Sequence, residues 1–192
     1  DGSGNTVKAK SVILAMGSAY REIGLENEKR LSGRGVSWCA TCDGFFFRDQ
    51  TIAVVGGGDS AVEEATFLTK FASKVVLIHR RDSLRASKIM AGRALSNPKI
   101  EMLWNTEVID VLGAEKVEAL SLKNTVTGEV SKRDFTGLFV AIGHDPRNEL
   151  IKGQITLDAE GYVVVENGST RTNLTGVFAC GDLVDHTYRQ AI

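Results

Sequence analysis

Residues 51–81 read TIAVVGGGDSAVEEATFLTKFASKVVLIHRR, and this stretch decides the fold. Its opening run, 51–58, is continuously apolar up to the glycines and rich in β-branched residues, which is typical of a strand buried on both faces. Residues 59–72 then place apolar side chains at helical spacing, and residues 74–81 form a second apolar run. A strand, a glycine turn, a helix and a second strand in succession predict an α/β protein with a parallel sheet.

The string GGGDSA at 56–61 fits the pattern G-x-G-x-x-A in the position where dinucleotide-binding turns occur. Gly56 is expected to permit the tight turn, Gly58 to let a pyrophosphate approach the backbone, and Ala61 to let the helix pack closely on the strand. The first turn of the helix would add free N–H groups and a partial positive charge. We therefore predict a dinucleotide site here, with a plain glycine-rich turn as the alternative.

Residues 79–85, HRRDSLR, follow the second strand and indicate which dinucleotide would bind. An NAD site would place Asp or Glu about twenty residues after the glycines, to accept hydrogen bonds from the ribose 2′-hydroxyl. Arg80, Arg81 and Arg85 instead suit a 2′-phosphate, because guanidinium groups bind phosphate oxygens in bidentate fashion. The sequence therefore predicts NADPH, and a solvated basic loop is the alternative.

Cys39-Ala40-Thr41-Cys42 forms a C-x-x-C pair in a chain with three cysteines and three scattered histidines. An odd number of cysteines cannot close a disulfide framework, and one pair falls short of the four ligands of a structural zinc site, so no metal is expected. A redox-active dithiol is the favoured interpretation, and two buried cysteines are the alternative. Asp43 follows directly and is placed either to pass protons to and from a leaving thiolate or to form a turn or helix cap.

The electron donor and the dithiol differ in the chemistry they can perform. NADPH delivers a hydride, which a disulfide does not accept directly. A dinucleotide site and a redox dithiol in one chain therefore call for a flavin between them, because flavins exchange both hydride and thiol electrons.

The other segments are interpreted from apolar runs and turn residues. After Asn97-Pro98 the pattern changes to short strands with a turn at 124–128, which predicts an antiparallel meander through residue 143. The remaining predicted elements are a strand at 7–18, a loop at 19–35, a helix at 83–95, a hairpin at 161–173 and a short strand at 176–182.

The composition is that of an ordinary globular chain, with 43% hydrophobic and 24% charged residues among 192. Lys and Arg total 23 against 24 Asp and Glu, and this near-neutrality argues against a nucleic acid or a membrane surface as partner. No apolar run approaches the ~18–20 residues that cross a bilayer, and the first residues show no signal-peptide pattern. We expect a cytoplasmic protein with one large domain or two small ones.

Three further strings accompany those at 56–68 and 79–90: WCATCDGFFF at 38–47, GLFVAIGHDP at 137–146 and GVFACGDLVDHTYRQAI at 176–192. Taken in chain order, the five strings resemble those of the low-molecular-weight bacterial thioredoxin reductases, most of all those of actinobacterial type. The resemblance runs from Val7 to Ile192. The resemblance implies an FAD-containing, cytoplasmic homodimer. It also implies that electrons pass from NADPH through the flavin to the dithiol, and then to thioredoxin.

The resemblance assigns roles to individual residues. By it, Cys42 faces the flavin, Cys39 exchanges with thioredoxin and Asp43 donates protons. The candidate NADPH-binding residues are Gly56, Gly57, Gly58, Asp59, Ser60, Ala61, His79, Arg80, Arg81, Arg85, Ile142 and Gly143. The candidate FAD-binding residues are Ala15, Gly17, Gly181, Asp182, Arg189, Gln190 and Ala191. Asp59 stands where the family commonly has asparagine, and we expect it to act on the adjacent ribose or on a helix end.

The resemblance also implies a domain order. A Rossmann-like NADPH and dithiol domain at 21–144, a three-layer β-β-α sandwich with an antiparallel β-meander crossover, is inserted into a discontinuous FAD domain formed by 1–20 and 145–192. The family's first G-x-G-x-x-G strand does not occur in these residues, and the helix after Gly181-Asp182 is expected to run past Ile192. Two alternatives follow: a truncated NADPH-binding module without turnover, and a related flavin–dithiol reductase with another disulfide substrate.

Overall fold

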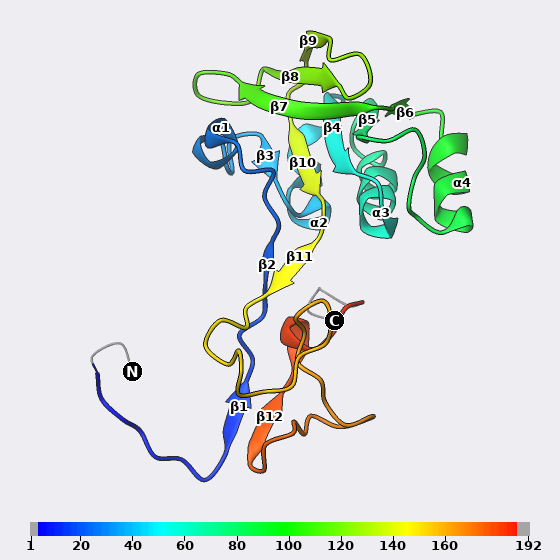
Figure 1. Ribbon diagram of the computed structural model, residues 1–192. Coiled ribbons are helices and arrows are strands. Elements are labelled where there is room, and N and C mark those ends of the chain that lie inside the picture. The colour runs from blue at the N-terminus through cyan, green and yellow to red at the C-terminus, as the bar shows by residue number, and fades with distance from the viewer. Residues whose placement is uncertain (1–3, 188–192) are drawn as a thin grey trace. The chain divides into compact units, whose positions relative to one another are not determined.

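The computed structural model of the chain describes residues 4–187. They form two compact units, whose elements are labelled in Figure 1. The larger unit is Arg21–Gly143, and the smaller combines the chain up to Tyr20 with the chain from His144 onward. No helix within the described residues is long and apolar enough to cross a membrane.

A five-stranded parallel sheet forms the centre of the larger unit. In spatial order its strands are β3 (Val36–Ser37), β10 (Leu138–Ala141), β4 (Thr51–Gly56), β5 (Lys74–Ile78) and β6 (Ile100–Leu103). Helix α3 (Asp59–Leu68) connects β4 to β5, and α4 (Lys88–Ser96) connects β5 to β6. The strand–turn–helix–strand unit predicted at 51–81 is therefore confirmed.

Alternating side chains bury both faces of this sheet. On one face, Ile52 and Val54 of β4 pack in a core with the apolar side of α3. On the other face, Ala53 belongs to a core shared with two antiparallel strands, β7 (Thr106–Leu112) and β8 (Ala119–Asn124). Strand β9 (Val130–Asp134) pairs with β8 and completes this three-stranded sheet. The larger unit therefore has three layers, an antiparallel sheet, the parallel sheet and the helices (Figure 1).

Two strands expected in the antiparallel meander belong to the parallel sheet instead. Strand β6 pairs in parallel with β5, and β10 lies between β3 and β4, parallel to both. Both are short apolar runs, whose local pattern is the same whichever neighbour they pair with. The meander prediction is wrong for β6 and β10, and it is confirmed for β7–β9.

The segment 19–35, predicted to be a loop, contains the end of β2 (Ser18–Tyr20) and helix α1 (Glu26–Arg30). Glu28 is fully buried, and its carboxylate accepts the backbone N–H groups of residues 23–25 at 2.8 to 3.2 Å. These bonds fold residues 23–25 back onto the first turn of the helix. They also satisfy the backbone N–H groups of these three residues. A single glutamate in a polar stretch carries no periodic signal, so the helix was not predicted.

Other predicted boundaries also shift. The helix predicted at 83–95 begins only at Lys88. The hairpin predicted at 161–173 is not formed, because Val163 bridges to Leu157 and Arg171 bridges to Phe178, both outside this segment. Helix α2 (Ala40–Asp43) and the 3₁₀ helix η1 (Gly44–Phe47) were not predicted. Elements of four residues are too short to show a helical period.

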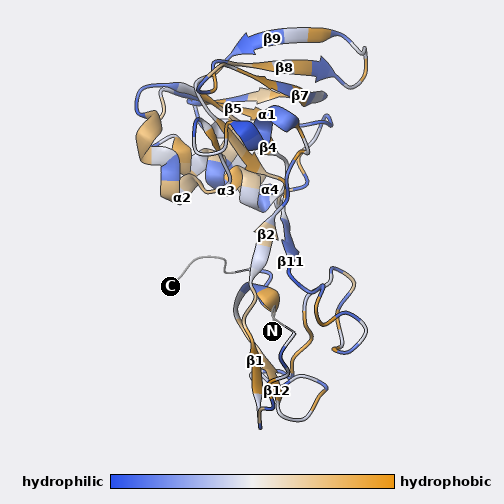
Figure 2. Ribbon diagram, turned by 90° about the vertical axis from the view of Figure 1, so that its left-hand side faces the viewer, coloured by the Kyte–Doolittle hydropathy of each residue, from blue (hydrophilic) through white to orange (hydrophobic). Residues whose placement is uncertain are grey.

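The smaller unit has a pair of parallel strands at its centre. Strand β1 (Val12–Leu14) pairs with β12 (Val177–Ala179), and a 3₁₀ turn, η2 (Gly181–Leu183), follows β12. Figure 2 shows both strands as predominantly hydrophobic. Strand β2 pairs antiparallel with β11 (His144–Pro146). The strand predicted at 176–182 is confirmed, whereas the strand predicted near the start of the chain is shorter than expected.

Candidate functional site

The C-x-x-C pair forms a disulfide at the start of α2, soon after the edge strand β3. The Cα atoms of Cys39 and Cys42 lie 5.3 Å apart. Cys39 is the N-cap residue of α2, and its sulfur accepts the backbone N–H of Cys42 at 3.3 Å. Cys39 is buried, whereas Cys42 is exposed. The structure therefore places one end of the disulfide against the core and the other at the surface.

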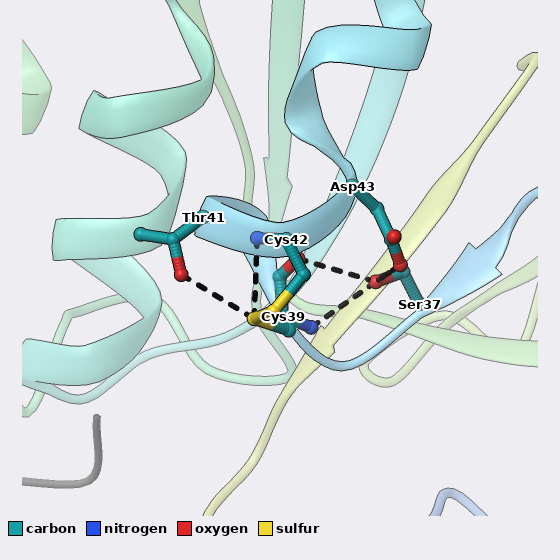
Figure 3. Close-up of a disulfide and its surroundings, with 5 residues drawn as sticks. All are labelled: Ser37, Cys39, Thr41, Cys42 and Asp43. Carbon is teal, nitrogen blue, oxygen red and sulfur yellow. Dashed lines mark hydrogen bonds between the residues drawn. A yellow bond between two sulfur atoms is a disulfide. The ribbon is translucent and has the colours of Figure 1, made fainter. Parts of the chain in front are cut away.

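Ser37 joins the disulfide turn to Asp43 (Figure 3). Its hydroxyl donates to Asp43 Oδ2 at 2.6 Å and accepts the backbone N–H of Cys39 at 3.1 Å. Asp43 precedes η1, but its carboxylate makes no capping bond there. Asp43 is thus the N-cap residue of η1 by position, but its carboxylate bonds Ser37 and not the helix backbone. Sequence reasoning missed Ser37, whose only signal was its position two residues before Cys39.

A cavity of about 470 Å³ lies at the C-terminal ends of β4, β5 and β10. Parallel sheets bind ligands at this edge. The predicted NADPH-binding residues that line it are Gly56, Gly57, Gly58, Ser60, His79, Arg80, Arg85, Ile142 and Gly143. Its other walls include Arg21 and Glu22, which precede α1, and Thr106 and Glu107 of β7. Sequence reasoning missed these four because they come from segments far from the glycine motif.

The three consecutive glycines are required for different reasons. A Cβ at Gly56 would overlap Ala61 Cβ and the carbonyl oxygen of Ala141, and one at Gly57 would overlap the imidazole of His79. Gly58 differs: its backbone is extended, with φ −94°, and a Cβ there would meet nothing within 4 Å. The fold therefore does not need glycine at position 58. The open space in front of its backbone fits a group that approaches closely, such as a pyrophosphate.

Three predicted NADPH-binding residues do not line the cavity. Ala61 is fully buried beneath Gly56. Asp59 Oδ1 accepts the backbone N–H of Ser87 at 2.8 Å, so its carboxylate lies at the start of α4. The side chain of Arg81 is exposed, outside the cavity wall. The expectation that Asp59 acts on a helix end agrees with its contact to Ser87.

His79 is a buried polar group on the cavity wall. Its side chain is 5% exposed, and Nε2 has no hydrogen-bond partner among the described residues. Burial lowers the pKa of His79 below 6.5, and the charges of Arg85 and Arg81 lower it further, against two backbone hydrogen bonds that raise it. The imidazole is therefore neutral at neutral pH, and its orphan nitrogen is a further polar atom that a bound dinucleotide would satisfy.

Glu64 on α3 is half-buried, and the sequence did not reveal its environment. Its Oε2 atom is buried without a partner among the described residues. Burial, together with the nearby charge of Glu63, raises the pKa of Glu64 from 4.5 to about 8. The carboxyl group is therefore protonated at neutral pH.

The candidate FAD-binding residues lie in the smaller unit. Ala15 and Gly17 follow β1, and Gly181 and Asp182 follow β12, at the C-terminal ends of two adjacent parallel strands. Ser18 Oγ lies 3.5 Å from Asp182 Oδ2, which joins the two turns. Arg189, Gln190 and Ala191 lie outside the described residues.

The combination of a dinucleotide-type βαβ unit and a nearby C-x-x-C disulfide defines a class of redox protein. The profile of the pyridine nucleotide-disulphide oxidoreductase family matches residues 1–192, and the chain belongs to this family. All 192 residues align with the thioredoxin reductase of Streptomyces coelicolor at 62% identity, and 187 residues, 97% of the chain, align with that of Mycolicibacterium smegmatis at 65%. The resemblance to actinobacterial thioredoxin reductases is therefore confirmed.

The chain spans 60% of the length of each of these two relatives. A solved structure gives the same result: the thioredoxin reductase from Streptococcus pyogenes is 44% identical, with a TM-score of 0.83. That match covers 94% of this chain and 59% of the other. The larger and smaller units therefore both follow the fold of thioredoxin reductases.

We expect Gly58→Ala to weaken nucleotide binding and Gly57→Ala to lower stability. Gly58→Ala should leave the unfolding temperature unchanged, because the new methyl group meets no atom, but it should weaken NADP⁺ binding by about tenfold by filling the space of a phosphate. Gly57→Ala should lower the free energy of unfolding by about 1–3 kcal/mol, because the methyl group displaces the His79 ring. Thermal unfolding and NADP⁺ titration calorimetry of the two variants test this, and a destabilised Gly58→Ala would contradict it.

Replacing Glu64 should change how stability depends on pH. An acid whose pKa rises from 4.5 to about 8 on folding does not change the free energy of unfolding below pH 4.5. Above pH 4.5 it lowers the free energy of unfolding increasingly with pH, and the effect is complete above pH 8. Glu64→Gln removes this ionisation, so it should stabilise the chain more at pH 8.5 than at pH 5. Urea unfolding at both pH values, with the exposed neighbour Glu63→Gln as control, measures the difference. An equal effect of Glu64→Gln at both pH values would contradict the assignment.

Proposed function

We propose that the chain carries the NADPH-binding and dithiol portion of a thioredoxin reductase, and that the complete protein reduces thioredoxin with electrons from NADPH. One observation carries the proposal: the Cys39–Cys42 disulfide and the open backbone of Gly58 belong to one unit, built on one parallel sheet. The 62% identity with the Streptomyces coelicolor enzyme over the whole chain supports it.

The cavity residues divide between two phosphate-bearing parts of NADPH, the central pyrophosphate and the 2′-phosphate of the adenosine ribose. The pyrophosphate would lie against Gly57 and Gly58, where the first turn of α3 presents free N–H groups. The 2′-phosphate would lie against Arg80 and Arg85, whose guanidinium groups match phosphate oxygens. Arg81 lies beside them and would reach the phosphate only by turning its exposed side chain toward the cavity. Asp59 and Ala61 would support the site from outside, through α4 and the β4–α3 contact.

We assign the smaller unit to FAD binding, with the larger unit inserted between its two chain segments. Ala15, Gly17, Gly181 and Asp182 would hold the cofactor at the ends of β1 and β12. When bound, FAD supplies the chemistry that links hydride donors to thiols. As in the resemblance, the complete protein would be a cytoplasmic homodimer.

The dithiol would then act by two thiol–disulfide exchanges. As the resemblance assigns the roles, the Cys39 thiolate, which is buried in this structure and must become accessible first, attacks one sulfur of the thioredoxin disulfide, so that a mixed disulfide forms and one thioredoxin thiolate leaves. Cys42 then attacks Cys39 Sγ, which re-forms the Cys39–Cys42 disulfide and releases the second thioredoxin sulfur. By the resemblance, Asp43, whose carboxylate is bonded to Ser37 beside the turn, would exchange protons with the Cys42 thiol.

Removal of either cysteine tests the dithiol in the complete protein. Cys39→Ser and Cys42→Ser should each reduce NADPH-dependent thioredoxin reduction by at least about 100-fold, because a single thiol cannot complete both exchanges. NADPH binding should persist, since neither sulfur lines the cavity. The third cysteine offers a matched control, because Cys180→Ala removes a free thiol and should leave turnover unchanged. Thioredoxin reduction that survives in both serine variants would contradict the proposal. If the wild-type protein reduces other disulfide substrates but not thioredoxin, thioredoxin is not its partner.

The arginines predict the choice of cofactor. Arg80→Ala and Arg85→Ala should each lower the preference for NADP⁺ over NAD⁺ by about tenfold, because each removes a charge-assisted bond to the 2′-phosphate. Arg93→Ala, an exposed arginine on α4, removes the same charge outside the cavity and should leave the ratio unchanged. Calorimetric dissociation constants for the two nucleotides give the ratio directly. If the ratio of the two dissociation constants is the same in the wild type and the three variants, the 2′-phosphate does not bind at Arg80 and Arg85.

A further inference from the structure

Ser37 is the most buried polar residue around the disulfide turn. It ends β3, and its side chain is 4% exposed. Its hydroxyl oxygen lies 2.6 Å from Asp43 Oδ2, 3.1 Å from the backbone nitrogen of Cys39 and 3.4 Å from the carbonyl oxygen of Cys39 (Figure 3). One hydroxyl therefore contacts both the first residue of the redox turn and the acid that follows it.

The directions of these bonds follow from the atoms present. The Cys39 amide can only donate, so the Ser37 oxygen accepts from it. The single hydroxyl proton then goes to the carboxylate at 2.6 Å, the shorter and charge-assisted of its two possible acceptors. The amide bond orients the hydroxyl, and the hydroxyl orients the carboxylate.

The backbone makes this contact possible. Asp43 N–H donates to the carbonyl oxygen of Cys39 at 3.1 Å, so the single turn of α2 stacks Asp43 over Cys39. Ser37 is anchored from the other side, because it pairs with Phe139 at the edge of the parallel sheet. The Asp43 carboxylate is therefore held in place relative to the sheet.

We propose that Ser37 is a positioning residue for the proposed dithiol reaction: its hydroxyl binds Asp43 Oδ2 and thereby fixes the carboxylate to which the resemblance assigns proton exchange with the dithiol. This inference rests on the proposed function of Cys39 and Cys42. In the second exchange, the Cys42 sulfur bonds to Cys39 Sγ while the mixed disulfide breaks, and the proton of Cys42 passes to Asp43. The two electrons leave with the substrate sulfur, which takes its proton from water.

The test measures the dithiol without any cofactor. The 192-residue chain, with Cys180→Ala to remove the third thiol, is reduced, desalted and mixed with 5,5′-dithiobis(2-nitrobenzoate), whose released thiolate is followed by absorbance. At about pH 6 thiols are mostly protonated, so Ser37→Ala should slow the closing exchange by about tenfold. At about pH 9.5 thiols ionise by themselves, and the difference should disappear. Ser37→Thr keeps the hydroxyl and should retain the wild-type rate.

The double variant separates positioning from simple support of the fold. If Ser37 acts through Asp43, Ser37→Ala with Asp43→Asn should be no slower than Asp43→Asn alone. Rates for Ser37→Ala that equal the wild type at pH 6, or that fall equally at both pH values, would overturn the inference. So would a double variant slower than Asp43→Asn. A wild-type dithiol that releases no thiolate from the reagent would instead overturn the proposed function, so the two failures can be told apart.

Discussion

The larger unit depends on the close approach of three backbone segments at Gly56. Helix α3 begins three residues after the last residue of β4 and packs closely on it, because Gly56 has no side chain and Ala61 has only a methyl group. The same absence lets β10 pair with β4 as far as Ala141. As a result, the first turn of α3 and the ends of three parallel strands surround one cavity. A side chain at Gly56 would separate the helix from the strand and remove the cavity floor.

The same sheet also positions the redox pair. Strand β3 lies next to β10 at the edge and ends at Ser37, and the disulfide and Asp43 follow in the next six residues. Two chemically different sites thus share one rigid support, one built from the backbone of the central strands and the other from the turn beyond the edge strand. Rigid elements keep reacting groups in place better than loops do. The short α2 turn illustrates this, because its few bonds are supplemented by Ser37 from the sheet.

Local sequence patterns predicted the central part of this arrangement and little of its periphery. Continuous apolar runs around GGGDSA identified β4, α3 and β5, and the cysteine spacing identified the disulfide. The pairing of β6 and β10 could not be predicted, because a short apolar run does not reveal its neighbour. Among the arginines, position in the sequence did not distinguish Arg80, which lines the cavity, from Arg81, which does not. The roles of Glu28 and Glu64 depend on the burial of their carboxyl groups. The sequence around a charged residue in a polar or mixed segment does not indicate such burial.

The functional proposal depends on NADPH binding by the larger unit at the cavity beside β4. An NMR titration of the ¹⁵N-labelled 192-residue chain with NADP⁺ tests it most directly, because amide shifts locate a ligand residue by residue. Saturable shifts should concentrate at the backbone amides of Gly57, Gly58 and Ser60. NAD⁺ should produce the same shifts only at concentrations about tenfold higher or more. Shifts confined to other residues, or equal titrations with NADP⁺ and NAD⁺, would contradict it.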